Sequence, residues 1–582
     1  MRSGLLLLVL LLGTGLAAQG PITGRVVDGT EGTPLPYATI LLVGSERGTI
    51  SNPDGFFDLP ATTAGDSIRV SFVGYRTRFV AVSEVLRTGT VRLERSAQQL
   101  REVTVRPDDR IYRRIAAIAR KLQRTPDLEG RLFFGMETYS DSTPVEMIHG
   151  FYNARTHGAR LSSLSLKQGR IGIAPKNDRY YINYNTTRAF ALIDIQAEQS
   201  PYPHSPLRFT KAADLRRGFH AEVVSTGEGP DAVDHLRVVP RPHNPEAFAL
   251  DLWVEPRTEH VRALELHCTN CPKHPFIPLF DHGHIDTVDL RYRQTWTTGP
   301  LHHPEVMELA LRVAYTGPDF SDDYRTHAVM HLFDPGGRFI EPLFTMIGDL
   351  PDYQRMGWLP EDPAFWERMH PPLPTERQRR DMDFLQQHDL RDGDWLVRLG
   401  PDAKHVTSHY ARWSATDRLW LHGVATRVPT EPFKRVVVRP SELTDGFGLA
   451  IYRPPLPVKL KAQIYLDLDT VNGRLLHRSA TVLDGYYSFD LVADQPWNAA
   501  FHNIWFDLCE VERRNLERAL NAPGVTLERA KALHAEYTAR LQGLTERYMK
   551  ETGSGDTFEG LLPWNTRVKE NLGIDNLKLF GF

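Results

Sequence analysis

A cluster of cysteines and histidines in the middle of the chain is the clearest candidate for chemistry. Cys268 and Cys271 are spaced CxxC, and His274, His282 and His284 follow closely. These five residues could hold zinc, with both cysteines, His274 and one of the last two histidines as ligands. A disulfide between the cysteines is the alternative that we favour, because exported proteins form such local bridges. Redox catalysis is a third interpretation, but the prolines after Cys271 prevent a helix that would lower the thiol pKa.

Two further sites carry side chains with catalytic potential. Asp467 and Asp469 lie two residues apart on a predicted strand, so both carboxylates face one side, as catalytic acids or as a solvated surface. Cys509 lies inside a predicted helix, where it is expected to be a small buried hydrophobic residue rather than a nucleophile. The sequence contains no nucleophile elbow, P-loop or dinucleotide fingerprint in the required context of strand and helix.

Composition limits the possible classes of protein. The 582 residues include 69 basic and 72 acidic side chains, a net charge of −3 that argues against binding of nucleic acid. The 43 glycines and 41 prolines favour a β-rich architecture with many turns. The three cysteines are too few to staple a chain of this length, so each domain must have its own hydrophobic core.

Hydrophobic patterning predicts a mainly β protein with an α+β C-terminal part. A sandwich of short strands is expected at residues 20–105, and a helix at 109–124 is expected to act as a linker within 106–128. Alternating residues predict a larger antiparallel β domain at 129–344, including a strand at 180–184. A proline-rich connector with short helices follows at 345–420. A mixed domain at 421–582 closes the chain, with helices at 498–520 and from the N-cap Thr526 onward.

The first residues are typical of a secretory signal peptide. Arg2 precedes an apolar run from Leu5 to Leu12, and small residues follow, with cleavage expected after Ala17 or Ala18. The run has about eight residues, whereas a membrane-spanning helix needs about 20. We therefore expect residues 1–18 to be removed and the protein to be exported to the periplasm or to associate with the outer membrane from its periphery.

The N-terminal motifs resemble a known family. Gly24–Asp28, Pro34–Ile40, Gly48–Phe57 and Ile68–Tyr75 are similar, in order and spacing, to the carboxypeptidase-like regulatory domain of Bacteroidota envelope proteins. The resemblance implies a transthyretin-like β-sandwich that serves as a scaffold and has no peptidase chemistry of its own. Leu100–Val105 resembles the segment that joins this module to the plug of TonB-dependent receptors, but no plug or barrel follows.

The C-terminal segment resembles a family of predicted secreted zinc peptidases that carry His-Glu-x-x-His followed by Phe-Asp. With Phe506-Asp507 aligned, this chain has Phe501, His502 and Trp505 where the family has its histidine, glutamate and histidine. Both zinc-binding imidazoles are therefore missing. The weak catalytic candidates that remain are His502, Asp507 and Glu510, and two carboxylates without histidines make a poor zinc site.

The sequence therefore predicts an exported scaffold or binding protein of the cell envelope without catalytic activity and without a cofactor, the alternative cofactor being zinc. Its expected partners are a protein, a peptide or a glycan of the envelope. A metal-dependent peptidase or other secreted hydrolase is one alternative function, and a glycan-binding protein is another.

Overall fold

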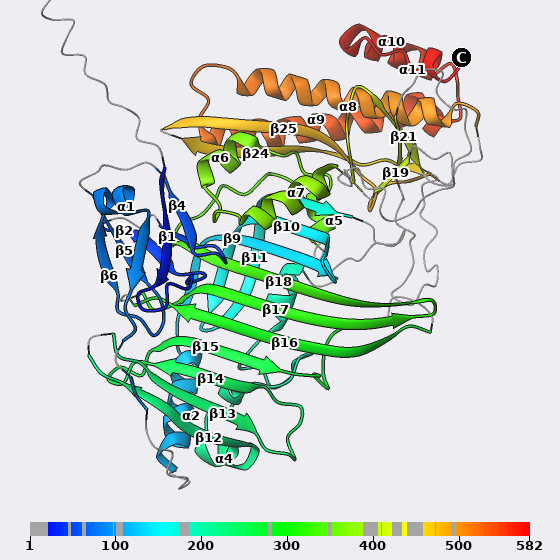
Figure 1. Ribbon diagram of the computed structural model, residues 1–582. Helices are drawn as coiled ribbons and strands as arrows, with labels where there is room; N and C mark the ends of the chain where they lie inside the picture. Colours follow the sequence, from blue (N-terminus) through cyan, green and yellow to red (C-terminus); the bar gives the residue numbers. More distant parts are fainter. Residues whose placement is uncertain are drawn as a thin grey trace, which may run out of the picture.

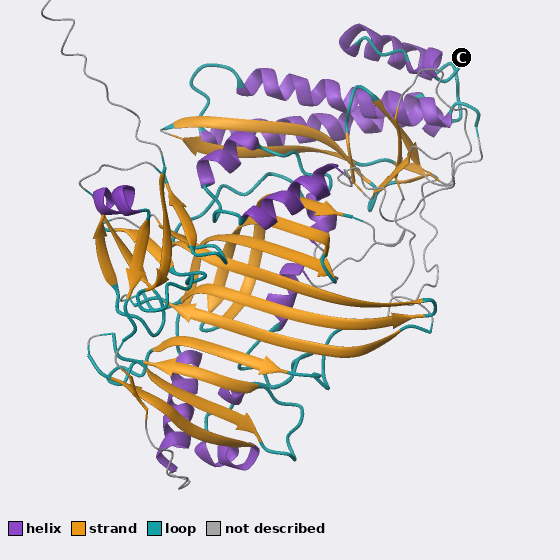
Figure 2. Ribbon diagram, viewed as in Figure 1, coloured by secondary structure: helices purple, strands orange, loops and turns teal. Residues whose placement is uncertain are grey.

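The computed structural model describes residues 21–44, 48–60, 66–96, 98–100, 109–174, 186–229, 231–276, 282–298, 301–346, 352–387, 405–408, 410–421, 434–438, 458–471, 473–490 and 495–582. The expected signal peptide and the strand expected at 180–184 lie outside these residues. Strands dominate the fold and helices gather at the C-terminal end, which confirms the predicted fold class (Figure 2). No described helix is long and apolar enough to cross a membrane.

The N-terminal part is a small β-sandwich. One sheet has the strand order β4-β1-β7 and the other β3-β2-β5-β6. The strands are β1 (Ile22–Asp28), β2 (Thr39–Leu42), β3 (Gly48–Ile50), β4 (Phe56–Leu59), β5 (Ser67–Ser71), β6 (Arg78–Ala81) and β7 (Thr90–Leu93). Their alternate residues, among them Val26, Phe57 and Val70, form a fully buried core. A short helix that the alternation did not predict, α1 (Val82–Thr88), ends at Gly89, whose φ of 65° suits glycine.

The middle of the molecule is one antiparallel sheet, which in the described residues has the strand order β11-β10-β9-β18-β17-β16-β15-β14-β13-β12-β8 (Figure 1). The strands are β8 (Gln98–Leu100), β9 (Asp127–Ser140), β10 (Thr143–His157), β11 (Arg160–Ile173), β12 (Phe219–Gly227), β13 (Asp234–Pro240), β14 (Ala249–Val254), β15 (Val261–Cys268), β16 (His284–Trp296), β17 (Pro304–Gly317) and β18 (Phe320–Pro335). β8 lies in the range expected for the sandwich, but it pairs with β12 and so belongs to this sheet.

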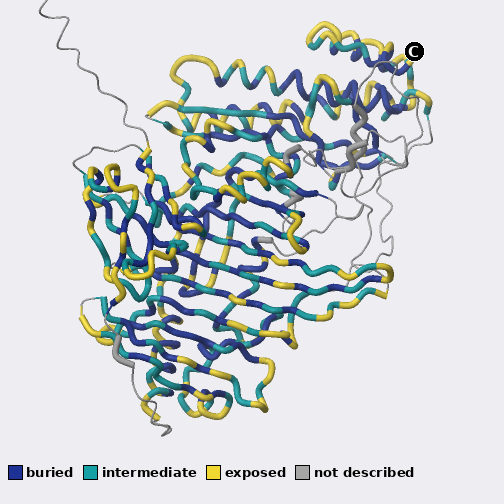
Figure 3. The backbone as a smooth tube through the Cα atoms, viewed as in Figure 1, coloured by how far each residue is buried: buried dark blue, intermediate teal, exposed yellow. Residues whose placement is uncertain are grey.

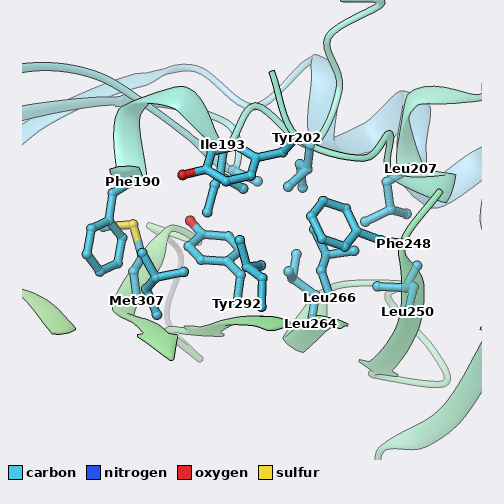
Figure 4. Packing of buried hydrophobic residues seen from close by; sticks show 14 of the residues in the cluster. Phe190, Ile193, Tyr202, Leu207, Phe248, Leu250, Leu264, Leu266, Tyr292 and Met307 are labelled. Carbon is cyan, nitrogen blue, oxygen red and sulfur yellow. The ribbon is translucent and has the colours of Figure 1, made fainter. Parts of the chain in front are cut away.

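One face of the sheet, which we call the inner face, carries Phe134 and Ile148 and packs against helices. The helices are α2 (Asp109–Gln123), α3 (Thr186–Leu192), the 3-10 turn η1 (Pro206–Arg208) and α4 (Ala212–Gly218). Figure 4 shows part of this core, where Phe190 of α3 lies near Tyr292 and Met307, and Leu207 of η1 lies near Phe248 and Leu250. α2 was expected to be a linker between domains, but its buried stripe, which includes Ile115 and Ala119, is part of this core.

The opposite face of the sheet, which we call the outer face, carries Phe133 and His149. The sandwich lies against it: Thr39 Oγ1 donates a hydrogen bond to Glu305 of β17 at 2.9 Å, and Arg293 of β16 lies over the ring of Phe72. Beside the sandwich runs the connector, residues 352–387, with helices α5 (Asp352–Met356), α6 (Pro363–Met369) and α7 (Glu376–Gln387). The sandwich and the connector cover only part of this face: Phe133, Phe151 and His331 are buried, whereas Arg237 and Val239 are exposed. Figure 3 shows how residues along the sheet vary from buried to exposed.

The C-terminal domain combines small sheets with a bundle of helices. Its strands are β19 (His405–Ser408), β20 (Tyr410–Arg412), β21 (Asp417–Leu421), β22 (Lys434–Val438), β23 (Val458–Lys459), β24 (Ala462–Val471), β25 (Arg474–Asp484) and β26 (Phe489–Asp490), and its helices are α8 (Asn498–Leu520), α9 (Leu527–Glu551), η3 (Gly553–Gly555), α10 (Leu561–Leu572) and α11 (Asn576–Leu579). α8 and α9 confirm the two predicted helices, and Thr526 caps α9 by accepting a hydrogen bond from the Arg529 amide. α8 is buried on almost every side, so it forms the centre of this domain.

Candidate functional site

Two neighbouring pockets lie on the outer face, where the sandwich, the sheet and the connector meet. The sandwich pocket has an empty volume of about 490 Å³, including its open mouth, and is lined from all three parts, by Tyr37, by Glu137 and His327, and by Leu373 among others. The arginine pocket has about 360 Å³, also including its mouth. It is lined by Met147, His149, Arg170, Ile171, Gly172, Glu361, Met382 and Leu385. Met147 and His149 line both pockets, so the two share a wall.

Strand register brings the polar side chains of this site together. His149 of β10 pairs with Gly135 of β9 and with Arg170 of β11, and His327 of β18 pairs with Glu137 of β9. Residues that pair across antiparallel strands share one face of the sheet. All four polar side chains therefore point to the outer face, beneath the connector.

A glycine lets the connector approach the sheet at the arginine pocket. A Cβ atom on Gly172 would lie 2.8 Å from Cβ of Leu385, which is closer than side-chain carbons pack. Leu385 of α7 is 1% exposed and packs with Met147 and Met382. Because Gly172 has no side chain, α7 can pack directly against the strand at this position.

Arg170 and His149 form the polar end of the arginine pocket. Arg170 donates from Nη2 and Nε to His149 Nδ1 at 3.0 and 3.3 Å, and its guanidinium carbon lies 4.4 Å from the ring centroid of Trp366. Burial, and then the charge of Arg170, lowers the pKa of His149 to about 3. The imidazole is therefore neutral at neutral pH, and because Nδ1 accepts, its proton is on Nε2.

The sandwich pocket holds a second polar group. The Tyr37 hydroxyl lies 3.5 Å from the ring nitrogens of His327, and the two rings stack. His327 Nδ1 lies 4.0 Å from Glu137 Oε1, and the Tyr139 hydroxyl lies 3.1 Å from Glu137 and 2.7 Å from Asp381 of α7. Burial lowers the pKa of His327 to about 4 and raises that of Glu137. These contacts tie the sandwich, the sheet and the connector to one another.

The candidates from the peptidase resemblance lie elsewhere, inside the C-terminal domain. His502 is 2% exposed, and its Nε2 lies 2.8 Å from Asp490 Oδ2. Asp507 accepts hydrogen bonds from Trp413 Nε1 at 2.7 Å, from Asn576 Nδ2 at 2.7 Å and from Arg418 Nη1 at 3.1 Å. The Arg418 side chain is 1% exposed, so this is a buried ion pair.

The third candidate, Glu510, is equally occupied. It accepts from Thr481 at 2.8 Å, from Arg513 Nη2 at 2.7 Å and from Arg514 Nε at 2.9 Å. Phe501 and Trp505, which stand at the positions of the family's histidines, are fully buried in the packed core. Cys509 is buried beside them, and burial raises the pKa of its thiol. The acidic side chains of α8 are thus hydrogen-bonded to other residues of the same domain.

The cysteine–histidine cluster is dispersed over one end of the central sheet. Cys268 and Cys271 are paired as a disulfide, with Cα atoms 5.5 Å apart. His274 packs on Phe276, His282 is exposed, and His284 Nε2 lies 2.9 Å from Asp286. Nowhere in the described part of the chain do three or more His, Cys, Asp or Glu side chains come together as metal ligands. The structure therefore does not assemble the zinc ligand set considered above.

The two acids of β24 each bind a cation from another part of the chain. Asp467 forms an ion pair with the buried Lys167 of β11 and accepts from Gln168 at 2.8 Å. Asp469 accepts from Arg368 of α6 at 2.6 Å. These two ion pairs join the C-terminal domain to the rest of the molecule. Asp467 binds the central sheet, and Asp469 binds the connector.

The sequence did not single out the residues around the pockets. The antiparallel β domain that contains His149 was predicted, but the pairing of Arg170 with that histidine depends on the register between β10 and β11, which includes a bulge after Phe151. The glycines at positions 169 and 172 were the available signal, because glycine within a strand marks a close approach by another element. That signal does not say which element approaches.

Comparisons with known proteins cover only part of the chain. No curated protein matches it. Among solved structures it is similar to the LolA superfamily protein NE2245 from Nitrosomonas europaea, at 12% identity over 41% of this chain and 94% of the other, but the TM-score of 0.15 is too low to support an argument. The model of the CarboxypepD_reg-like domain matches residues 22–105. This match confirms the carboxypeptidase-like regulatory domain predicted for the N-terminal part.

Proposed function

We propose that this chain is an exported binding protein of the cell envelope, without catalytic activity, and that the two pockets of the outer face are its binding site. The observation that carries the proposal is the composition of the arginine pocket. Arg170 is hydrogen-bonded to the neutral His149, and the pocket around them is lined by Glu361 and by apolar side chains from the sheet and the connector. Convergent polar groups in an apolar pocket are the usual form of a binding site.

The occupied state of the α8 side chains favours this function over a hydrolase. A catalytic carboxylate must reach water or substrate, whereas Asp507 and Glu510 are engaged by buried donors. We propose that the C-terminal domain is a peptidase-like domain that has lost its metal ligands and now serves as a structural support.

A hydrolysis assay tests the absence of activity. The purified mature protein, with zinc added, is incubated with casein, alongside Glu510→Gln and the control Glu517→Gln on the same helix. We expect no cleavage above background by any of the three. Zinc-dependent cleavage by the wild type that Glu510→Gln abolishes and Glu517→Gln retains would overturn the proposal.

Export to an oxidising compartment, in the envelope of a Bacteroidota-like bacterium, is part of the proposal. The signal peptide expected at residues 1–18 and the Cys268–Cys271 disulfide support it. Protein recovered from the periplasm and denatured without reductant should react with iodoacetamide at Cys509 alone, and at all three cysteines after reduction. Recovery of the mature chain only from the cytoplasm, with three reactive thiols, would contradict export.

A further inference from the structure

Two helices of the connector, α6 and α7, are held on the outer face by very different contacts. α6 places Phe365 and Trp366 against the ring of Phe151, at centroid distances of 5.4 and 5.1 Å, within a buried aromatic cluster. In its last turn, Arg368 donates to Asp469 of the C-terminal domain at 2.6 Å. Aromatic packing and an ion pair to a second domain therefore fix α6.

α7 rests on the sheet through fewer apolar contacts. Its apolar anchor is Leu385, which packs with Met382 of the same helix and with Met147 of β10. A polar contact adds to this, since the Tyr139 hydroxyl donates to Asp381 at 2.7 Å. Most of the twelve residues of α7 are charged or carry amides, and a helix of this length has little stability in water on its own. We therefore expect α7 to leave the sheet at a lower cost in free energy than α6.

The segment that joins the two helices is suited to act as a hinge. His370 ends α6 in the left-handed region, at a φ of 45°, and three of the next four residues are prolines. Proline has no N–H to donate. In the described structure, no backbone hydrogen bond joins residues 371–374 to another part of the chain. Movement of α7 relative to α6 therefore breaks no such bond at this joint.

The movable part of the connector is also the part that closes the two pockets. The connector residues that line the sandwich pocket are Pro372, Leu373, Pro374 and Gln378, and those that line the arginine pocket are Glu361, Met382 and Leu385. All of these except Glu361 follow the hinge or lie in it. α6 contributes no residue to the described lining of either pocket. Displacement of residues 371–387 would thus uncover both pockets and leave α6 in place.

We propose that residues 371–387 are a lid over the two pockets, which opens about residues 371–374 while α6 stays on the sheet. This inference rests on the proposed binding function and specifies how a ligand reaches that site. The structure shows the closed state, in which Leu385 packs over Gly172 of β11. A ligand enters when α7 leaves the sheet, and this opening does not require unfolding of the rest of the protein.

Thiol reactivity of the full mature chain tests the lid. Leu385→Cys and Phe365→Cys each introduce one thiol at a position that is 1% exposed, the first on α7 and the second on α6. Both proteins are labelled without reductant, so that the Cys268–Cys271 disulfide stays closed, at urea concentrations below the unfolding transition. The native Cys509 thiol, which is buried in α8, serves as an internal reference for global unfolding.

The two introduced thiols should differ in rate and in urea dependence. We expect the thiol of Leu385→Cys to react at least about tenfold faster than that of Phe365→Cys. Its rate should change little with urea, because local opening exposes little surface. The thiol of Phe365→Cys should react only as fast as Cys509, with the urea dependence of global unfolding.

A second pair of thiols shows whether the opening reaches the pockets. Met147 lies under α7 in the wall that both pockets share, whereas Ile148, next to it on β10, belongs to the inner core. The thiol of Met147→Cys should react at the rate found for Leu385→Cys, and that of Ile148→Cys should be as slow as Cys509. Fast reaction of Leu385→Cys without Met147→Cys would mean that α7 loosens without opening the site, which overturns the proposal.

Hydrogen exchange of the unsubstituted protein provides a test that no variant can disturb. The hydrogen-bonded amides of α7 should exchange at least about tenfold faster than those of α6, although α7 is the longer helix. Equal protection of the two helices, or equal thiol rates for Leu385→Cys and Phe365→Cys, would overturn the lid. The casein assay described above tests the binding function separately, because its outcome does not depend on the motion of α7.

Discussion

Two buried polar clusters of this protein differ in how completely their members are paired. Around α8, Asp507 has donors on both carboxylate oxygens, and Arg418 lies against it as a counter-ion. On the outer face of the central sheet, Arg170 has a neutral histidine and an aromatic ring as neighbours and contacts no described carboxylate. A closed network stabilises a fold, whereas an incomplete one has capacity for a ligand.

The difference also shows why residue type alone is a poor guide to a site. The α8 segment has the acids that we considered as catalytic candidates from the sequence, but the fold uses them as internal counter-ions. For the outer face the sequence predicted only strands. In the structure, histidines, a glutamate and an arginine from strands far apart in the chain lie together on this face. Partners decide what an ionisable side chain does.

The largest expected effect separates the two arginines. Arg418→Met leaves the Asp507 carboxylate buried without its cation, which should lower the free energy of unfolding by about 3–5 kcal/mol. Arg170→Met leaves no contacting carboxylate behind, so a loss of about 1 kcal/mol is expected from the stacking on Trp366. Denaturant unfolding followed by circular dichroism measures both.

A second pair of variants checks this explanation. The double variant Arg418→Met/Asp507→Leu should regain most of the lost stability, since removal of both charges ends the imbalance. If Arg170→Met is as destabilising as Arg418→Met, then Arg170 is a structural residue and the contrast between the clusters disappears.

A smaller effect is expected where the connector meets the sheet. Gly172→Ala places a Cβ atom against Leu385 and should cost about 1–3 kcal/mol through overpacking. Gly543→Ala is the matched control, because no atom lies within 4 Å of its Cβ position, and alanine should stabilise α9 by about 0.5–1 kcal/mol. Thermal unfolding of both variants decides the signs. A stabilised Gly172→Ala protein would show that α7 does not depend on this glycine.

The last comparison concerns pH. Burial lowers the pKa of His331 on the outer face to about 3, whereas an unfolded histidine titrates near 6.5. Between these values the unfolded chain binds more protons, so the free energy of unfolding falls as the pH falls below 6.5. With these two pKa values, His331→Phe should reduce this loss between pH 7 and 4 by up to about 3 kcal/mol. Unfolding curves at several pH values measure it.

The comparison between wild type and variant isolates the histidine. Burial raises the pKa of Glu305 and Glu308 on the same face. Their contribution to the free energy of unfolding therefore increases as the pH falls. Their contribution cancels in the difference between the two proteins. Identical pH dependence of wild type and His331→Phe would mean that His331 is not held neutral in the folded protein.

Local signals predicted much of the fold. Residues that are close together in the sequence determine the apolar stripe of α2, the cap at Thr526 and the alternation of buried and exposed residues in β16. The place of α2 was not predictable in this way, because an amphipathic helix needs some apolar partner and its sequence does not say which. The order of the central sheet was hidden for the same reason, since β9 pairs with a strand far along the chain.

The candidate site was less predictable than the fold. His149, Arg170 and Trp366 meet only when the register of β10 and β11 and the seat of the connector are known. The cysteine pair is three residues apart, so its geometry is local and sequence reasoning could weigh a disulfide against a metal site. A site assembled from three distant segments leaves no comparable local signal.

The pairing of β9 with β18 sets an order of events for folding. Ser140 pairs with Tyr324 and Gly130 with Pro335, so this contact closes a loop of about 200 residues, and such long-range contacts form slowly. The sandwich, by contrast, has all its strands by Leu93. A chain that emerges N-terminus first can complete the sandwich early. β9 and β10, with their apolar inner face, remain without the neighbouring strand β18 until that strand has been made. During that interval the nascent sheet presents an unpaired edge, which is the stage at which a holding chaperone would contribute most.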